Sequence, residues 1–375
     1  MTRAPAHSER LICLCRPGFE GECALETTAL GEAHGIAGQA QADPASGYVE
    51  FVPSARPGQS GWEQLADWRR HIFARECLPV FAVLDGLPRN DRLTPILRVL
   101  GERGERYSDV WVEAPDSDEG KALAPFCRSF GNALVGALKK AALLDPRVPG
   151  KNPGAADGRE PAARRLHAFF PQGDKVYLGA VNPAAATPWP QGIPRLKFPH
   201  AAPSRSTLKL EEGLLVLLGD DERSRGLKPG MSAVDLGAAP GGWTWQFVSR
   251  SVRVTAVDNG PMDPALMQSG LVTHRREDAF RFQPKKAVDW MVCDMVEQPR
   301  RVAELVARWF TQGWCRRSIF NLKLPMKKRY EETQLCLELI RAQIAKHHAA
   351  SAITLRARQL YHDREEITVY CAVAR

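Results

Sequence analysis

The chain has 375 residues, too many for one ordinary domain, and its 44% apolar and 25% charged content is typical of a globular protein. Its net charge of +8 favours a polyanionic partner such as nucleic acid. No stretch approaches the roughly 18 apolar residues of a membrane span, and MTRAPAHSER at the start lacks the apolar core of a signal peptide. We therefore expect a cytoplasmic protein of two or three domains with no membrane partner.

The first half alternates predicted strands and helices. Strands are predicted at 10–17, 47–53, 77–84 and 107–116, and helices at 20–35, 92–104 and 118–143. The last helix could break at Pro125. A loop is expected at 145–161, followed by a hairpin of strands 164–171 and 175–181. This order predicts small α+β units, two of them.

The second half shows a different pattern after a proline-rich linker at 184–206. A helix is predicted at 207–218, and strands at 232–237, 251–258, 271–276, 287–294, 318–324, 352–361 and 366–374. Helices separate most of these strands, the clearest at 299–313 and 330–347. They predict a mostly parallel sheet whose ligands lie at the carboxyl ends of the strands. Only HDRE joins the last two strands, so these should pair antiparallel.

The nine cysteines are scattered and contain no C-x-x-C pair. An odd number fits a disulfide framework poorly, and most of them stand in apolar stretches, where cysteine is a small buried hydrophobe. His347 and His348 have no acidic or cysteine ligand set beside them. The sequence therefore predicts reduced thiols and no metal site.

A glycine-rich turn follows the first strand of the second half, in AVDLGAAPGGWTWQF at 233–247. The strand ends at Gly237, and a helix is predicted to start at Gly241 and Gly242. Glycine permits a close backbone approach to a ligand, Pro240 presets φ at a helix start, and helix N-terminal amides favour a negative group. The order is not G-x-G-x-x-G, so no NAD site is expected. An ordinary strand–turn–helix connection is the alternative.

Four acids stand at or just after the ends of four successive strands. They are Asp235, Asp258, Asp278 and Asp294. Since parallel strands end at one edge of a sheet, we expect all four to face one crevice. Asp258 could there accept both hydroxyls of a ribose. Each acid alone could instead be a helix cap, so the series is the signal.

Long strings spread over nearly the whole chain carry a family resemblance. They are LCRPGFEGEC, APSRSTLKLEE, VDLGAAPGGWT, AVDNGPM, WMVCDM, FNLKLPMKKRYEE and QLYHDREE. Together they resemble the RlmM family of bacterial 23S rRNA cytidine 2′-O-ribose methyltransferases. The resemblance implies an α/β fold, in which an N-terminal α+β region precedes a C-terminal Rossmann-like class I methyltransferase sheet. The implied segments are ferredoxin-like at 1–90, THUMP-like and RNA-binding at 91–183, a linker at 184–206 and the methyltransferase domain at 207–375.

The resemblance also implies a cofactor, a substrate and an oligomeric state. The cofactor is S-adenosyl-L-methionine, and the substrate is 23S rRNA, protein-free or early in assembly, acted on by a monomer. The implied cofactor-binding residues are Ser206, Gly237, Ala239, Pro240, Gly241, Gly242, Asp258, Asp278 and Asp294. Asp258 would hold the ribose, Asp278 the adenine edge, and the turn from Gly237 to Gly242 the methionine end.

The implied catalytic residues resemble the Lys-Asp-Lys-Glu set of FtsJ-type 2′-O-methyltransferases. They are Lys209, Asp294, Lys323 and Glu366, with Glu365 as the alternative to Glu366. A neutral lysine can deprotonate a ribose hydroxyl, but the pKa of free lysine is about 10.4. Burial and a second cation lower that pKa, the two carboxylates raise it, and the sequence leaves open which effect prevails. Lys323 is the expected general base and Lys209 its electrostatic helper.

Three cations, Lys327, Lys328 and Arg329, follow the strand that carries Lys323. They could bind phosphates flanking a target ribose, or they could form a solvated loop. Two other functions stay open: methylation of another RNA or of a base, and a catalytically silent RNA-binding assembly factor. Base methylation would more often use a cysteine nucleophile, and Cys293 is expected in the core.

Overall fold

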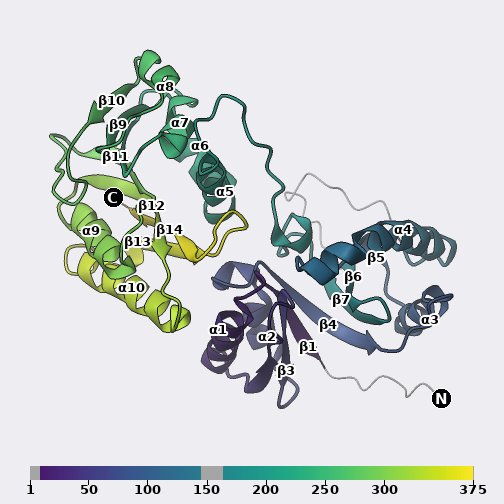
Figure 1. Cartoon of the computed structure of the whole chain (residues 1–375). Helices are drawn as coiled ribbons and strands as arrows, with labels where there is room; N and C mark the ends of the chain where they lie inside the picture. The colour runs from purple at the N-terminus through teal and green to yellow at the C-terminus, as the bar shows by residue number, and fades with distance from the viewer. Residues whose placement is uncertain (1–8, 145–163, 375) are drawn as a thin grey trace, which may run out of the picture. The chain divides into compact units, whose positions relative to one another are not determined.

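The computed structural model describes residues 9–144 and 164–374, which form two compact units divided between Ile193 and Pro194 (Figure 1). The loop predicted at 145–161 lies outside the described residues. Each unit is built on one sheet. Within the described part of the chain, no helix is long and apolar enough to cross a membrane.

The sheet of the first unit has seven strands in the order β2-β3-β1-β4-β7-β6-β5. Its strands are β1 (Arg10–Leu14), β2 (Gly38–Gln41), β3 (Tyr48–Pro53), β4 (Glu76–Leu84), β5 (Tyr107–Glu113), β6 (Arg164–Gln172) and β7 (Lys175–Val181). Its helices are α1 (Glu20–Ala33), α2 (Gln59–Ala66), α3 (Leu93–Arg103) and α4 (Asp118–Lys140). All neighbouring strands are antiparallel except β5 and β6.

Strand β4 joins the two halves of this sheet. Its first residues, from Glu76 to Val80, pair with β1, and its last residues, to Leu84, pair with β7. The two predicted α+β units therefore share one sheet. Helix α4 runs through Pro125 without a break. Its buried Leu134 and Leu138 pack in the core of the half of this sheet that contains β5, β6 and β7. Such tertiary packing offsets the loss of the hydrogen bond that proline cannot donate.

The sheet of the second unit is the predicted, mostly parallel one, and its strand order is β10-β9-β8-β11-β12-β14-β13. Its strands are β8 (Ser232–Leu236), β9 (Arg253–Val257), β10 (Val272–Arg275), β11 (Val288–Cys293), β12 (Cys315–Lys323), β13 (Ile353–Arg358) and β14 (Glu366–Val373). Its helices are α5 (Thr207–Leu217), α6 (Asp220–Gly226), α7 (Gly242–Val248), α8 (Pro264–Gln268), α9 (Pro299–Thr311) and α10 (Arg329–Ile344). The strands from β10 to β12 are parallel, and β14 pairs antiparallel with β12 and β13, as predicted.

The order of the parallel strands reverses between β8 and β11, where the chain changes the face on which its helices lie. Helices α5 and α7 cover one face of the sheet, and α9 and α10 cover the other (Figure 1). Trp290, Phe247 and Tyr370 pack together in the core on the α5 side. In open α/β sheets, ligands bind outside the carboxyl ends of the strands at such a reversal.

Candidate active site

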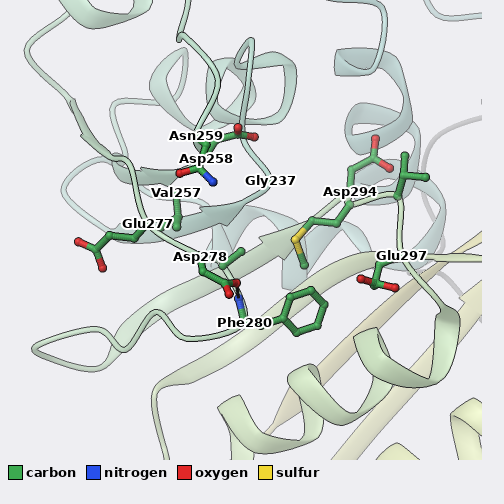
Figure 2. A pocket seen from close by; sticks show the side chains of 12 residues that line it. Gly237, Val257, Asp258, Asn259, Glu277, Asp278, Phe280, Asp294 and Glu297 are labelled. Carbon is green, nitrogen blue, oxygen red and sulfur yellow. Dashed lines mark hydrogen bonds between the residues drawn. The ribbon is translucent and has the colours of Figure 1, made fainter.

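A pocket of about 490 Å³ lies at the carboxyl ends of β8, β9 and β11 (Figure 2). It is lined by Gly237, Val257, Asp258, Asn259, Glu277, Asp278, Ala279, Phe280, Asp294, Met295, Val296 and Glu297. Its volume lies within the range of small-molecule sites. Gly237 lies between Asp258 and Asp294, while Glu277 points away from the other labelled side chains (Figure 2).

Two glycines of the glycine-rich turn lie where a side chain would clash with a neighbouring residue. Gly237 has φ +75, and a Cβ there would lie 2.4 Å from Cγ of Met295. A Cβ on Gly242 would lie 2.3 Å from the hydroxyl oxygens of both Ser204 and Ser206. Helix α7 begins at Gly242. The predicted helix start at Gly241 and Gly242 is therefore confirmed, whereas Pro240 lies two residues before the helix and not at its first position.

The predicted cofactor residues fall into two groups. Gly237, Asp258, Asp278 and Asp294 line the pocket, whereas Ser206, Ala239, Pro240, Gly241 and Gly242 are outside its lining. One member of the second group, Ala239, contacts a member of the first. Ala239 donates its N–H to Oδ2 of Asp258 at 2.9 Å, and the carbonyl of Ser206 accepts the indole N–H of Trp243 at 3.1 Å.

Asp258 and Asp278 are both held by backbone amides. Oδ1 of Asp258 accepts the N–H of Gly260 at 2.7 Å, in addition to the bond from Ala239. Oδ1 of Asp278 accepts the N–H of Phe280 at 2.8 Å. A carboxylate has about four acceptor positions, so Asp258 keeps about two for the hydroxyls of a ligand.

Asp235 does not face the pocket, and the prediction that four acids share one crevice is wrong for it. Its side chain is buried, and its Oδ2 accepts the hydroxyl of Thr244 on α7 at 2.7 Å. Burial raises the pKa of Asp235 to about 7. Asp235 precedes the strand end by one residue, so the alternation of side chains turns it toward α7.

The lining of the pocket is strongly negative. Its charged members are Asp258, Glu277, Asp278, Asp294 and Glu297, and no lysine or arginine is among the described residues that line it. Such a pocket repels phosphates and attracts organic cations. Its charge thus agrees with the sequence argument against a dinucleotide.

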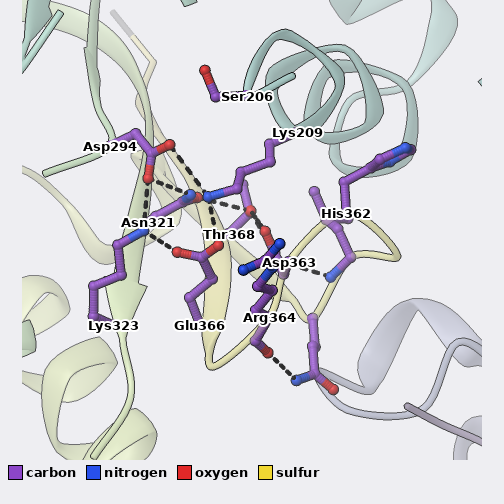
Figure 3. A network of polar contacts seen from close by, with 12 residues as sticks. Ser206, Lys209, Asp294, Asn321, Lys323, His362, Asp363, Arg364, Glu366 and Thr368 are labelled. Atoms are coloured by element: carbon purple, nitrogen blue, oxygen red, sulfur yellow. Dashed lines mark hydrogen bonds and ion pairs between the residues drawn. The ribbon is translucent and has the colours of Figure 1, made fainter. Parts of the chain in front are cut away.

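Beside the pocket, two lysines and two carboxylates form a cluster of alternating charge (Figure 3). Nζ of Lys323 lies 2.8 Å from Oδ1 of Asp294, and it also contacts Oε2 of Glu366. Nζ of Lys209 lies 3.3 Å from Oδ2 of Asp294 and 2.5 Å from Oε1 of Glu366. Each carboxylate therefore bridges both ammonium groups.

Four separate elements bring this cluster together. Lys209 is on α5, and Asp294 follows β11 directly. Lys323 ends β12 and lies opposite Glu366, the first residue of β14, in the antiparallel ladder. The side chain of Glu366 is only 5% exposed, so it stays tightly bound to both lysines.

The environment of Lys323 answers the question left open by the sequence. Burial lowers the pKa of the amine, but the charges and hydrogen bonds of Asp294 and Glu366 raise it by more. The pKa of Lys323 therefore lies above its ordinary value, and the amine is protonated at neutral pH.

The residues that flank Lys323 and Glu366 face elsewhere. Glu365 pairs with Arg329 at 2.6 Å, so Glu366 and not Glu365 reaches the cluster. Lys327 and Lys328 are exposed. Of the three predicted phosphate-binding cations, Arg329 is thus engaged in an ion pair, and the two lysines present their charges to solvent.

Sequence reasoning missed three polar residues behind the cluster: Asn321, Asp363 and Thr368. All three are buried and hydrogen-bonded to one another or to Asp294 (Figure 3). A signal existed for Asn321, because it interrupts the apolar run IFNLKL. A polar residue inside a buried strand needs a partner.

Two groups in the first unit have the composition of metal ligands. They are Cys13, His71 and Cys77, and Glu76, Glu113 and His167, each with ligand atoms within 4.8 Å of one another. Their members come from separate strands and loops, so no sequence spacing indicated them. Nδ1 of His167 is already hydrogen-bonded to Glu113 at 2.7 Å. The nine cysteines, all within the described residues, are free and buried.

Comparison with known proteins gives matches along the chain. The FtsJ-like methyltransferase profile matches residues 202–347, the RlmM ferredoxin-like domain 8–78, and the N-terminal region of ribosomal RNA large subunit methyltransferase M 91–181. A ribosomal RNA large subunit methyltransferase M from Xanthomonas oryzae pv. oryzae is 53% identical over 96% of this chain and 98% of its own. The protein of that name from Xanthomonas axonopodis pv. citri is 52% identical over the same shares.

Proposed function

Because the chain belongs to the ribosomal RNA large subunit methyltransferase M family, we propose that it methylates the ribose 2′-oxygen of a cytidine in 23S rRNA, with S-adenosyl-L-methionine as methyl donor. The observation that supports this most is the cluster of Lys209, Asp294, Lys323 and Glu366 at the edge of an acidic pocket. Lysines held by carboxylates suit the deprotonation of a hydroxyl better than attack on a base.

The acidic pocket fits this cofactor in charge. S-adenosylmethionine supplies an electrophilic methyl group on a cationic sulfonium and also carries an ammonium group, and both favour a lining with five carboxylates. We assign the ribose to Asp258, whose oxygens keep free acceptor positions, and the adenine edge to Asp278. The turn from Gly237 to Gly242, with Ser206 behind it, would hold the methionine end.

Lys323 would act as the general base. Asp294 and Glu366 fix its amine at the carboxyl end of β12, next to the pocket. Its raised pKa means that it must lose a proton before it can accept one from the hydroxyl. Additional positive charge beside the cluster lowers the pKa of an ammonium, so binding of a sulfonium favours that loss. Lys209 shares both carboxylates and would stabilise the forming oxyanion.

Replacing Asp258 by alanine should weaken cofactor binding by roughly 1.5–3 kcal/mol, the range for hydrogen bonds to a charged group. Calorimetric titration of the folded variant with S-adenosylmethionine measures this. Asp221→Ala, an exposed acid of α6 outside the pocket lining, is the matched control and should bind as the wild type does. Equal affinity in wild type and Asp258→Ala would remove Asp258 from the site.

The N-terminal half should supply RNA affinity and placement without chemistry. Residues 1–183 would form the ferredoxin-like and THUMP-like segments, and the pocket and the lysine cluster both lie beyond them. A fragment of residues 184–375 should bind the cofactor like the full chain but lose most methyl transfer to long RNA. Full activity of this fragment on 23S rRNA would contradict a role of the N-terminal half in RNA binding.

Lys327 and Lys328 should bind RNA phosphates. Changing both to alanine should weaken RNA binding and reduce the slope of log affinity against log salt by roughly one unit for each phosphate that is no longer neutralised. Filter binding between low and moderate salt measures the slope. Lys285 and Lys286 form a matched exposed pair, and their double alanine variant should leave the slope unchanged. An unchanged slope in the Lys327 and Lys328 variant would show that these lysines form a solvated loop and bind no phosphate.

We place this activity in the cytoplasm and in a monomer. Nine free, buried cysteines suit a reducing compartment, and all four members of the lysine cluster come from one chain. We propose 23S rRNA that is protein-free or early in assembly as the substrate.

Mapping of 2′-O-methylation on rRNA from cells that lack the protein tests the function. One cytidine of 23S rRNA should lose its 2′-O-methyl group, and expression of the wild-type chain should restore it. Loss of a methyl group from another RNA, or from a base, would replace this proposal with one of its rivals.

A further inference from the structure

A chain of hydrogen bonds leads from the lysine cluster to a buried acid in the turn between β13 and β14 (Figure 3). Nδ2 of Asn321 donates to Oδ1 of Asp294 at 2.9 Å. Oδ1 of Asn321 lies 2.9 Å from the hydroxyl oxygen of Thr368. That hydroxyl oxygen lies 3.0 Å from both carboxyl oxygens of Asp363. Asp294 is thus connected to a second acid through two neutral side chains.

Counting protons along this chain fixes the direction of each bond. Asp294 holds two ammonium groups as a carboxylate, so Asn321 must turn its NH₂ toward Asp294 and its oxygen toward Thr368. An amide oxygen only accepts, so Thr368 must give it the single hydroxyl proton. Thr368 can then only accept from Asp363. The bond between them therefore requires a proton on Asp363.

The surroundings of Asp363 favour the same protonation state. Its side chain is 1% exposed, and burial raises the pKa of the carboxyl well above its usual range. The charges of Glu366 and Glu212 raise it further, whereas the N–H of Leu360 and the charge of Lys209 lower it. Leu360 donates that N–H to Oδ2 at 2.9 Å, so Oδ1 is the oxygen that carries the proton.

The turn that carries Asp363 is fixed in place by α5. Glu212, buried and one helical turn from Lys209, accepts the backbone N–H groups of Tyr361 and His362 at 2.8 and 3.0 Å. It also pairs with the ring of His362 at 2.7 Å. Asp363 and Lys209 are therefore positioned by the same helix.

We propose that Asp363 is a buried, neutral carboxylic acid that positions Asp294, and through it the amine of Lys323, by donating a hydrogen bond to Thr368 and so orienting Asn321. This inference rests on the proposed function for its catalytic consequence, but not for the protonation state. Asp363 is a positioning residue, because two side chains separate it from Asp294 and its hydrogen bonds go to Thr368 and Leu360.

Orientation of Asp294 matters because each of its oxygens has a separate task. Oδ1 holds Lys323, and Oδ2 holds Lys209. If Asn321 were released, its amide could flip and present its oxygen to the carboxylate, and the repulsion would turn Asp294 away. Misplacement of a catalytic group by about 1 Å can cost on the order of 10²-fold in rate.

Infrared difference spectroscopy of wild type against Asp363→Asn tests the protonation state directly. At neutral pH the wild type should show a carbonyl stretch of a protonated carboxylic acid that is missing from the Asp363→Asn variant, while the partly protonated Asp235 contributes equally to both spectra and cancels in the difference. The measurement needs no substrate. A carboxylate signal assigned to Asp363 instead would overturn the proposal whether or not the protein methylates RNA.

Single-turnover methyl transfer tests the positioning role. Asp363→Asn places an NH₂ donor and an oxygen acceptor where the neutral acid has them, so it should retain a rate within about threefold of wild type. Asp363→Leu and Thr368→Val should each lower kcat on the order of 10-fold with unchanged cofactor affinity, and the double variant should be no slower than either alone. Valine has nearly the same shape as threonine, so Thr368→Val still tests the positioning role if Asp363→Leu does not fold.

The pH profile separates this role from a charge effect. An ionised Asp363 would raise the pKa of Lys323, so Asp363→Asn would shift the rise of the rate to lower pH. A neutral Asp363 predicts no shift. A shifted profile, or additive losses in the double variant, would contradict the proposal. Absence of any methyl transfer by the wild type would instead count against the proposed function, and the infrared result would still decide the state of Asp363.

Discussion

Lys323→Arg should be nearly as inactive as Lys323→Ala in methyl transfer to RNA. The guanidinium keeps the positive charge beside Asp294 and Glu366 but stays protonated at any working pH, so it cannot accept a proton. General-base catalysis typically contributes about 10²–10⁴-fold, and both variants should lose that much. Single-turnover transfer at saturating RNA and cofactor is the measurement, so that binding does not limit the rate.

The controls for Lys323 are its binding properties and its pH dependence. Cofactor and RNA affinities of both variants should match the wild type, because Lys323 is not in the pocket lining. Since its pKa is raised, the neutral fraction is small at pH 7, and the wild-type rate should climb roughly tenfold per pH unit toward that pKa. Near wild-type turnover by Lys323→Arg would mean that Lys323 contributes only its positive charge. The proton of the ribose hydroxyl would then leave through Asp294 or water.

Asp294→Ala should lose both turnover and cofactor affinity, unlike any lysine variant. Asp294 lines the pocket and also bridges Lys209 and Lys323, so its removal leaves two ammonium groups on one carboxylate, Glu366. Asn321 would keep a buried donor with no acceptor. We expect a loss of roughly 10²–10⁴ in turnover, as for the base itself.

Comparison with Glu366→Gln shows whether the loss of cofactor affinity in Asp294→Ala comes from the pocket or from the lysine cluster. Glu366 bridges the same two lysines but is outside the pocket lining. Its variant should therefore lose turnover and keep cofactor affinity. Calorimetry together with single-turnover rates distinguishes the two. Unchanged cofactor binding by Asp294→Ala would separate the lysine cluster from the cofactor site.

The sheet of the second unit could be predicted because its strands are short apolar runs separated by amphipathic helices. Its site residues could be placed at strand ends, since parallel strands end at one edge. Asp235 was misplaced because a single residue of register decides whether a side chain faces the ligand or the covering helix. The same alternation separates Glu366 from Glu365, which pairs with Arg329.

The features that sequence reasoning missed depend on contacts between distant segments. Asn321, Asp363 and Thr368 form one network only after β12 and β14 pair. In the first unit, the first residues of β4 pair with β1 and its last residues pair with β7. No hydrophobic periodicity in the sequence indicates that one strand joins the two α+β units in this way. Strand β2, with the sequence GQAQ, was missed because it has almost no apolar residues to alternate.

The most direct test of the account is the chemical identity of the product. The purified chain should be incubated with protein-free 23S rRNA transcript and S-adenosylmethionine labelled in its methyl group, and the RNA should then be digested to nucleosides and analysed by mass spectrometry. The label should be found in 2′-O-methylcytidine, and Lys323→Arg should yield almost none. Label in a base-methylated nucleoside would contradict the assignment of Lys323 and its cluster to a ribose hydroxyl.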